Sequence, residues 1–249
     1  MEISTYNIQD LIVATRIHCM EGREPINLER SRQWVRAALE YAGHVIIAVD
    51  TEASTVIKPL EAEFDGALGV LLVHPWIGYT APLNAIVQYV ASLGKTRLLL
   101  QSAELSCKSL DILVMHKYLD QSTLVVGGAV CAEHGGTPGP KILDEFCAPW
   151  NTLALWNLEI LRLTGFLAVS DGEYGGVEEV ATISLLQRIR PGAANAMLLK
   201  NLTITWQADF SDEQRASYHA RKMETKTLRA KYQLAKLGIE PGTGLVVEQ

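Results

Sequence analysis

The sequence predicts an α/β protein of three layers, α/β/α, built on a mostly parallel central sheet. Short apolar runs of strand length recur along the first hundred residues, and amphipathic stretches of helical length separate them. Runs that are apolar throughout are typical of parallel strands covered by helices on both faces. The predicted strands of this part are Leu11–Ile17, His44–Asp50, Ala67–His74 and Thr96–Gln101.

Two helices are predicted to connect these strands. The first, Leu28–Tyr41, has apolar residues at near-helical spacing, and Gly43 follows it. The second, Pro82–Ser92, is followed by Gly94. Glycine just beyond a periodic stretch is a common end signal of a helix.

The second half of the chain is predicted to mix helices, strands and one long loop. An apolar stretch with proline at its start and glycine at its end is typical of a helix. The elements predicted here are a helix over Leu110–Leu119, a strand over Thr123–Val130, a loop over Glu133–Pro140, helices over Pro149–Gly165 and Glu178–Arg190, a strand over Leu202–Trp206 and a polar helix over Asp212–Leu237.

The composition excludes several classes of protein. Of the 249 residues, 48% are hydrophobic and 20% are charged, which is too apolar for a disordered chain and too charged for a membrane bundle. We expect one domain over residues 1–249, with residues 211–249 as its C-terminal basic helix and tail. The net charge of -6 argues against a nucleic-acid partner. No leader or membrane-spanning run is visible and the four cysteines are far apart, so we expect a cytoplasmic protein with free thiols.

Positive charge is concentrated near the end of the chain. Between Arg215 and Lys236 the sequence has seven Lys or Arg residues and one acid. Such a segment is either a local anion site or a solvated helix face. In the first interpretation His219, together with Arg215, Arg221, Lys222 and Lys226, would help to clamp a diphosphate.

Three common site motifs are absent. The sequence contains no GxGxxG after its first strand, no GxxxxGK[ST] and no GxSxG. This argues against dinucleotide enzymes, P-loop NTPases and serine hydrolases of the α/β type. In open α/β sheets ligands bind beyond the carboxyl ends of the strands, so the residues that follow each strand are the candidates.

Polar residues follow three of the predicted strands. Asp50 would accept a hydrogen bond from a ligand or cap a helix. Asn84 lies in the first turn of its helix, where free N–H groups would suit an anion unless the His74–Asn84 run is a packed loop. Glu104 follows the fourth strand as a single carboxylate, where a divalent metal would favour two.

Two adjacent glutamates begin a later helix. Glu178 and Glu179 follow the pair Gly175-Gly176, which would let a ligand approach the backbone closely. A carboxylate held there could act as a general base toward a hydroxyl. The alternative is a pair of charges that simply favours the helix dipole.

The order of these pieces, from Leu11 to about Lys236, resembles that of the nucleotide-diphospho-sugar transferases, the GT-A type of glycosyltransferase domain. HVIIAVD ends where the family has its base-reading aspartate, which implies that Asp50 contacts the base or ribose. GYTAPLN is similar to the family segment that ends in an asparagine, here Asn84. TRLLLQSAE takes the place of the strand with the acidic metal motif, which implies Ser102 at the substrate and Glu104 as a ligand of Mn²⁺ or Mg²⁺. A late metal-binding histidine of some members would match His219.

The resemblance continues downstream. VVGGAV resembles the strand before the acceptor loop. APWNTLALWNLEILRLTGF is similar to the acceptor helix, which implies that Trp150 and Asn151 bind substrate. GGVEEVATISLLQR resembles the segment that supplies the catalytic base, which implies Glu179 or Glu178. The implied reaction moves a sugar from a nucleoside diphosphate sugar to an acceptor hydroxyl.

One departure keeps other functions open. The acidic metal motif is replaced by Gln101–Glu104 and lacks its first carboxylate. A non-catalytic nucleotide- or sugar-binding relative is favoured by this loss and by the aromatic residues around Trp150 and Trp156. A nucleotidyltransferase would be supported by a glycine-rich loop after the first strand, where CMEGREPINLERSR has a single glycine.

Overall fold

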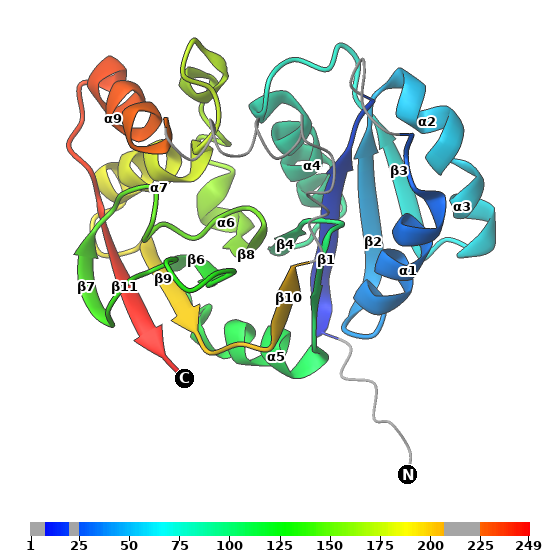
Figure 1. Ribbon diagram of the computed structural model, residues 1–249, viewed down its shortest axis with the longest axis horizontal. Helices are drawn as coiled ribbons and strands as arrows, with labels where there is room; N and C mark the ends of the chain where they lie inside the picture. Colours follow the sequence, from blue (N-terminus) through cyan, green and yellow to red (C-terminus); the bar gives the residue numbers. More distant parts are fainter. Residues whose placement is uncertain (1–7, 20–24, 207–224) are drawn as a thin grey trace.

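A computed structural model of the chain describes residues 8–19, 25–206 and 225–249. In this part of the chain nine strands form one sheet in the order β3-β2-β1-β4-β8-β6-β9-β11-β7 (Figure 1). Its strands are β1 (Ile8–Ile17), β2 (Ala42–Val49), β3 (Leu68–Leu72), β4 (Arg97–Gln101), β6 (Thr123–Gly128), β7 (Gly139–Ile142), β8 (Leu153–Asn157), β9 (Asn195–Lys200) and β11 (Thr243–Glu248).

Most neighbouring strands of this sheet are parallel, which confirms the prediction. The parallel pairs are β3–β2, β2–β1, β1–β4, β6–β9 and β9–β11. β8 runs antiparallel to both β4 and β6, and β7 runs antiparallel to β11. A separate two-stranded sheet joins β5 (Leu105–Cys107) to β10 (Ile204–Trp206).

Helices cover both faces of the sheet, as predicted (Figure 1). The first face carries α4 (Thr80–Ser92), α6 (Leu158–Leu161), α7 (Glu178–Ile189) and α9 (Lys226–Leu237), and the second carries α1 (Leu28–Ala38), α2 (Thr51–Ile57), α3 (Pro59–Glu63) and α5 (Ser109–Tyr118). A 3₁₀ turn, η1 (Ala168–Asp171), precedes α7. None of the described helices has both the length and the apolar character needed to cross a lipid bilayer.

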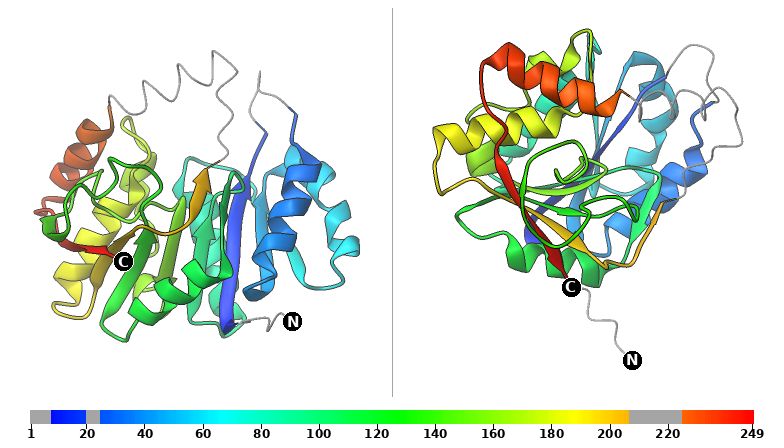
Figure 2. Two further views of the ribbon diagram at one scale, coloured as in Figure 1. Left: turned by 60° about the horizontal axis from the view of Figure 1, so that its bottom comes forward. Right: turned by 60° about the vertical axis from the view of Figure 1, so that its left-hand side comes forward.

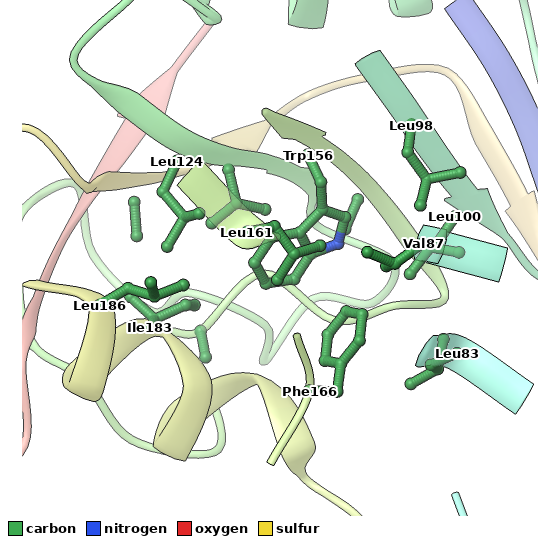
Figure 3. Close-up of a cluster of buried hydrophobic side chains, with 14 of the residues drawn as sticks. Leu83, Val87, Leu98, Leu100, Leu124, Trp156, Leu161, Phe166, Ile183 and Leu186 are labelled. Carbon is green, nitrogen blue, oxygen red and sulfur yellow. The ribbon is translucent and has the colours of Figure 1, made fainter. Parts of the chain in front are cut away.

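The core on the first face is centred on Trp156 (Figure 3). Its indole is fully buried and meets the ring of Phe166 edge-on, with 5.1 Å between the ring centroids. Leucines of α4, β4 and α6 surround the pair, and Ile183 of α7 lies nearby. The functional site therefore lies next to a packed apolar core.

The predicted helix over Pro149–Gly165 is wrong. This segment forms β8, then the single turn α6, and Gly165 ends it at a φ of +64°. An apolar run without a clear period is compatible with a buried strand as well as with a helix. Here the pairing of β8 with β4 and β6 decides for the strand.

The end of the chain also differs from the prediction. The glycine-rich tail contains β11, which inserts into the sheet between β9 and β7 and is red in both views of Figure 2. β9, β7, β5 and the short helices α2 and α3 were not predicted either. Of the polar helix predicted over Asp212–Leu237, α9 is the described part and the remainder lies outside the described residues.

The glycine pair of β6 brings a second segment close to the strand. A Cβ on Gly127 would lie 2.6 Å from Cβ and 2.8 Å from Cα of Pro149. Glycine inside a strand is typical where another backbone approaches closely. The absence of a side chain here lets the segment that leads into β8 lie against β6.

Gly127→Ala should therefore destabilise the fold. We expect the free energy of unfolding to fall by roughly 1–3 kcal/mol, because the methyl group would displace the Pro149 backbone. Urea denaturation measures the change. Gly172→Ala is the matched control, since the nearest atom to its Cβ would be 3.7 Å away, and equal stability losses in the two variants would contradict the packing argument.

Candidate functional site

A cavity of about 620 Å³ lies at the carboxyl ends of β1 and β4. Because β8 is antiparallel to β4, the residues that precede β8 reach the same edge of the sheet. Lining residues come from the end of β1 and beyond (Ala14, Thr15, Arg16, His18), the approach to α4 and its start (Trp76, Gly78, Tyr79, Pro82, Leu83), the end of β4 (Leu100, Gln101, Ser102), the approach to β8 (Trp150, Asn151, Thr152), the start of α7 (Val177, Glu178, Glu179) and from Trp206 and Lys226.

The start of α7 has an unusual backbone. Val177 is its N-cap at φ +60° and ψ +38°, in the left-handed region, and Gly176 before it has a φ of +89°. A β-branched residue rarely adopts this region, and such residues concentrate at functional sites. The conformation directs the first turn of α7, with Glu178 and Glu179, against the cavity.

Helix α9 holds the turn that leads into α7. The Arg229 guanidinium donates to the carbonyl of Gly175 at 2.7 Å. The Gln233 amide donates to the carbonyls of Gly176 at 2.6 Å and Tyr174 at 3.1 Å. The described basic residues of α9 thus have different roles. Arg229 supports the turn, Lys226 lines the cavity, and Lys231 and Lys236 are exposed.

Asn151 positions the two carboxylates of α7. Its backbone N–H donates to Glu179 Oε1 at 2.6 Å, and its side-chain Nδ2 donates to Glu178 Oε1 at 3.2 Å. The indole N–H of Trp156 donates to Asn151 Oδ1 at 2.9 Å. Since that bond determines which end of the amide faces the core, the amide N–H₂ must face Glu178.

The carboxyl group of Glu179 is a base suited to neutral pH. Both glutamates are at most 6% exposed. Burial, followed by the charge of Glu178, raises the pKa of Glu179 from 4.5 to about 7, although the Asn151 N–H and Lys226 act in the opposite direction. Arg16 forms an ion pair with the neighbouring glutamate, with its Nη2 3.7 Å from Glu178 Oε1. A general base works best when its pKa is near the working pH.

Removing the Asn151 side chain should destabilise the protein. Asn151→Ala leaves the buried Trp156 N–H without its acceptor and Glu178 without a donor, so we expect a loss of about 1–3 kcal/mol in urea denaturation. Asn195→Ala is the control, because this exposed amide donates only to the hydroxyl of Ser122 among its described contacts. Equal losses in the two variants would show that the buried amide has no special role.

Trp150 forms one wall of the cavity and is covered on both faces. The His134 ring stacks on it with 3.7 Å between centroids, and Lys226 Nζ lies 3.1 Å from the Trp150 ring centroid. Two groups this close to the ring cannot share a face, so the lysine lies opposite the histidine. Burial lowers the pKa of His134 to about 4, and its Nε2 lies 2.9 Å from the Ala148 carbonyl. His134 is therefore a neutral structural partner of the wall.

Two predicted binding residues have structural roles away from the cavity lining. Asp50 caps α2, since its carboxylate accepts from the N–H groups of Ala53 at 2.7 Å and Cys19 at 2.8 Å. Asn84 donates to the carbonyl of Phe166 at 2.8 Å and accepts from its N–H at 2.7 Å. The helix-cap alternative therefore describes Asp50, and the Asn84 amide is bonded to the backbone of Phe166 outside the cavity lining.

A side chain of the protein already occupies the first amides at the start of α4, where an anion site was expected. Asp171 accepts from the N–H of Tyr79 at 2.5 Å, from the N–H of Thr80 at 2.9 Å and from the Thr80 hydroxyl. Gly78 makes this possible, because its φ is +58° and a Cβ there would lie 2.3 Å from Asp171 Oδ1. The anion at this helix start is therefore the protein's own Asp171 carboxylate.

The described residues do not fit the divalent metal implied by the sequence. Gln101 stands at the first position of the metal motif and is 2% exposed. Its amide accepts from the Tyr41 hydroxyl and donates to the Leu105 carbonyl. Ser102 lines the cavity and accepts the Glu104 N–H at 3.3 Å, but Glu104 itself is not a lining residue. Within residues 8–19, 25–206 and 225–249, no three His, Cys, Asp or Glu side chains are placed to hold a metal ion.

The cavity combines predicted residues with others that were missed. Ser102, Trp150, Asn151, Glu178 and Glu179 meet there. The predicted His219, Arg221 and Lys222 lie outside the described residues. The lining residues that were not predicted to bind a ligand include Arg16, His18, Trp76, Tyr79 and Trp206, whereas Lys226 belongs to the basic segment proposed to clamp a diphosphate. A charge at the carboxyl end of an apolar strand, the pattern that pointed to Asp50, also marks Arg16 in β1.

The comparisons with known proteins rest on structure. No protein-family model and no curated protein matches the sequence. The structure is similar to a mannosyltransferase from Pyrobaculum calidifontis solved with GDP-Man and Mn²⁺, at a TM-score of 0.61 and 14% identity. That match covers 94% of this chain and 65% of the mannosyltransferase, so the chain spans just under two thirds of that protein.

Two further solved structures have related folds. GalNAc-T7 with UDP, GalNAc and Mn²⁺ matches at a TM-score of 0.52 and 11% identity over 74% of this chain and 41% of its own. The 4-diphosphocytidyl-2C-methyl-D-erythritol synthase of Anaerococcus prevotii matches at 0.50 and 12% identity over 87% and 96% of the two chains. This chain therefore has the GT-A-type fold of the nucleotide-diphospho-sugar transferases, shared with related nucleotidyltransferases.

Proposed function

We propose that this protein transfers a sugar from a nucleoside diphosphate sugar to an acceptor hydroxyl. The observation that carries the proposal is Glu179, a buried carboxyl group in the wall of the cavity whose pKa is raised to about 7. The cavity volume of about 620 Å³ lies within the usual range for small-molecule sites. The fold adds support, since it is shared with the mannosyltransferase solved with GDP-Man.

In the proposed reaction Glu179 accepts the proton of the acceptor hydroxyl. The oxygen attacks the anomeric carbon of the donor, and the bond from that carbon to the diphosphate oxygen breaks. Asn151 keeps the Glu179 carboxylate in place during this step through its N–H at 2.6 Å. Indole rings of Trp76 and Trp206 in the cavity wall offer apolar surface for a sugar or a base. We place the activity in the cytoplasm, where the four free thiols would stay reduced.

A non-catalytic nucleotide- or sugar-binding protein is the second candidate. The observation that favours it is Gln101, which replaces a carboxylate of the family motif and serves the fold instead.

One experiment separates the two candidates. The purified chain is incubated with UDP- and GDP-sugars and a panel of sugar acceptors, and donor binding and nucleoside diphosphate release are both measured. Release that depends on an acceptor supports the transferase. Binding without release supports the binding protein, and the absence of donor binding would overturn both.

A further inference from the structure

The position that carries the metal motif in this fold family is part of the folded core here. The carbonyl oxygen of Gln101 accepts from the Tyr41 hydroxyl at 2.5 Å, and its amide nitrogen donates to the Leu105 carbonyl at 3.0 Å. These bonds join the end of β4 to the start of β2 and to β5. A neutral amide that is 2% exposed and bonded at both ends is a poor ligand for a divalent cation.

Two cations of the chain line the same cavity. Arg16 lies two residues after Ala14, which pairs with Leu100 of β4, so Arg16 belongs to the strand next to the one that carries Gln101. Its Nη1 donates to the Tyr79 carbonyl at 2.9 Å, and its Nη2 lies 3.7 Å from Glu178. A guanidinium has five N–H donors in a planar fork that matches phosphate oxygens. Arg16 is thus oriented by the protein and keeps donors for a ligand.

Lys226 supplies the second charge from the opposite end of the chain. It is the first residue of α9, is 7% exposed and lies over the Trp150 ring with its Nζ 3.1 Å from the centroid. An ammonium held at low exposure on an aromatic face interacts strongly with an anion, because little water screens it.

We propose that Arg16 and Lys226, and not a divalent cation at the end of β4, neutralise the diphosphate of the bound nucleotide. This inference rests on the proposed function. When the bond from the anomeric carbon to the diphosphate oxygen breaks, its electron pair passes to that oxygen, and the two cations stabilise the added negative charge. Nucleotide binding is then independent of divalent metal.

The test measures the affinity of UDP, GDP, CDP and ADP by titration calorimetry, once in excess EDTA and once with Mn²⁺. We expect the preferred nucleotide to bind with the same dissociation constant in both buffers. Arg16→Gln and Lys226→Met should each weaken binding in EDTA by roughly 10- to 100-fold, the effect of losing one charged hydrogen bond. Lys236→Met is the matched control, because Lys236 is exposed and lies outside the cavity.

The outcomes are distinct. Binding that requires Mn²⁺ would overturn this inference and leave the proposed function intact. Metal-independent binding that is equal in wild type, Arg16→Gln and Lys226→Met would also overturn it. Failure of every nucleotide in both buffers would overturn the proposed function itself. Thermal unfolding of each variant separates loss of binding from loss of fold. Arg16→Lys keeps the positive charge without the planar fork, so it should bind the nucleotide more tightly than Arg16→Gln does.

Discussion

Glu179→Gln should lower sugar transfer by roughly 100- to 10,000-fold, the usual contribution of a general base. The amide still accepts the Asn151 N–H but cannot take a proton, so donor affinity should change little. In the wild type kcat/KM should rise with pH through about 7, because the base is active only when it has lost its proton. Initial rates between pH 5 and 9 measure both effects, and the variant should lack this rise.

Two neighbouring glutamates make this prediction specific. Glu173→Gln is the matched control, because Glu173 is exposed and lies outside the cavity lining. Glu178→Gln removes the charge that helps to raise the pKa of Glu179, so the rise in kcat/KM should move to lower pH. Full transfer activity in Glu179→Gln would show that another group accepts the proton.

Two buried groups, His134 and Glu179, should change the stability of the protein with pH in opposite directions. The pKa of His134 is about 4 in the folded protein, against 6.5 in the unfolded chain, so the folded state loses about 3 kcal/mol as pH falls from 6.5 to 4. Glu179 takes up its proton at about pH 7 when folded and at 4.5 when unfolded. Its contribution therefore rises as pH falls through this window, and the two effects nearly cancel.

In Glu179→Gln the effect of His134 on the free energy of unfolding should no longer be cancelled. As pH falls from 7 to 4.5, the free energy of unfolding of the variant should drop by about 3 kcal/mol relative to the wild type, because the compensating glutamate is gone. Urea denaturation at steps of one pH unit measures the difference, with Glu173→Gln as the reference that should follow the wild type. Parallel curves for Glu179→Gln and the wild type would show that the two groups do not titrate as described.

Local patterns predicted much of the first half of the fold. β1 to β4 and the helices α1 and α4 were found because their apolar runs and glycine ends are local signals. β8 was mistaken for a helix since its strand state depends on β4 and β6, which lie far away in the sequence. β11 was missed because a short segment among glycines becomes a strand only between its partners β9 and β7.

The candidate site, like the fold, could be predicted only in part from local patterns. The carboxylates Glu178 and Glu179 were identified by the glycine pair before them and by resemblance to a family segment, and both lie in the cavity wall. Asp50 looked like a ligand residue because a helix cap and a binding aspartate have the same position after a strand. The approach of Arg16 and Lys226 to one cavity joins residues 210 positions apart, and no local pattern reports such a contact.

The cap that Asp171 places on α4 has a consequence for how the chain can be divided. The Thr80 N–H donates to Asp171, which lies 91 residues further along the chain. Asp171 in turn lies just before the turn whose Gly175 carbonyl accepts from Arg229 of α9. A fragment ending after β4 would contain every residue of α4 yet leave its first amides without this carboxylate. The parallel strands β3, β2, β1 and β4 therefore depend on a later segment for the cap of α4, and a split or circularly permuted protein should keep η1 together with α4 to retain that cap.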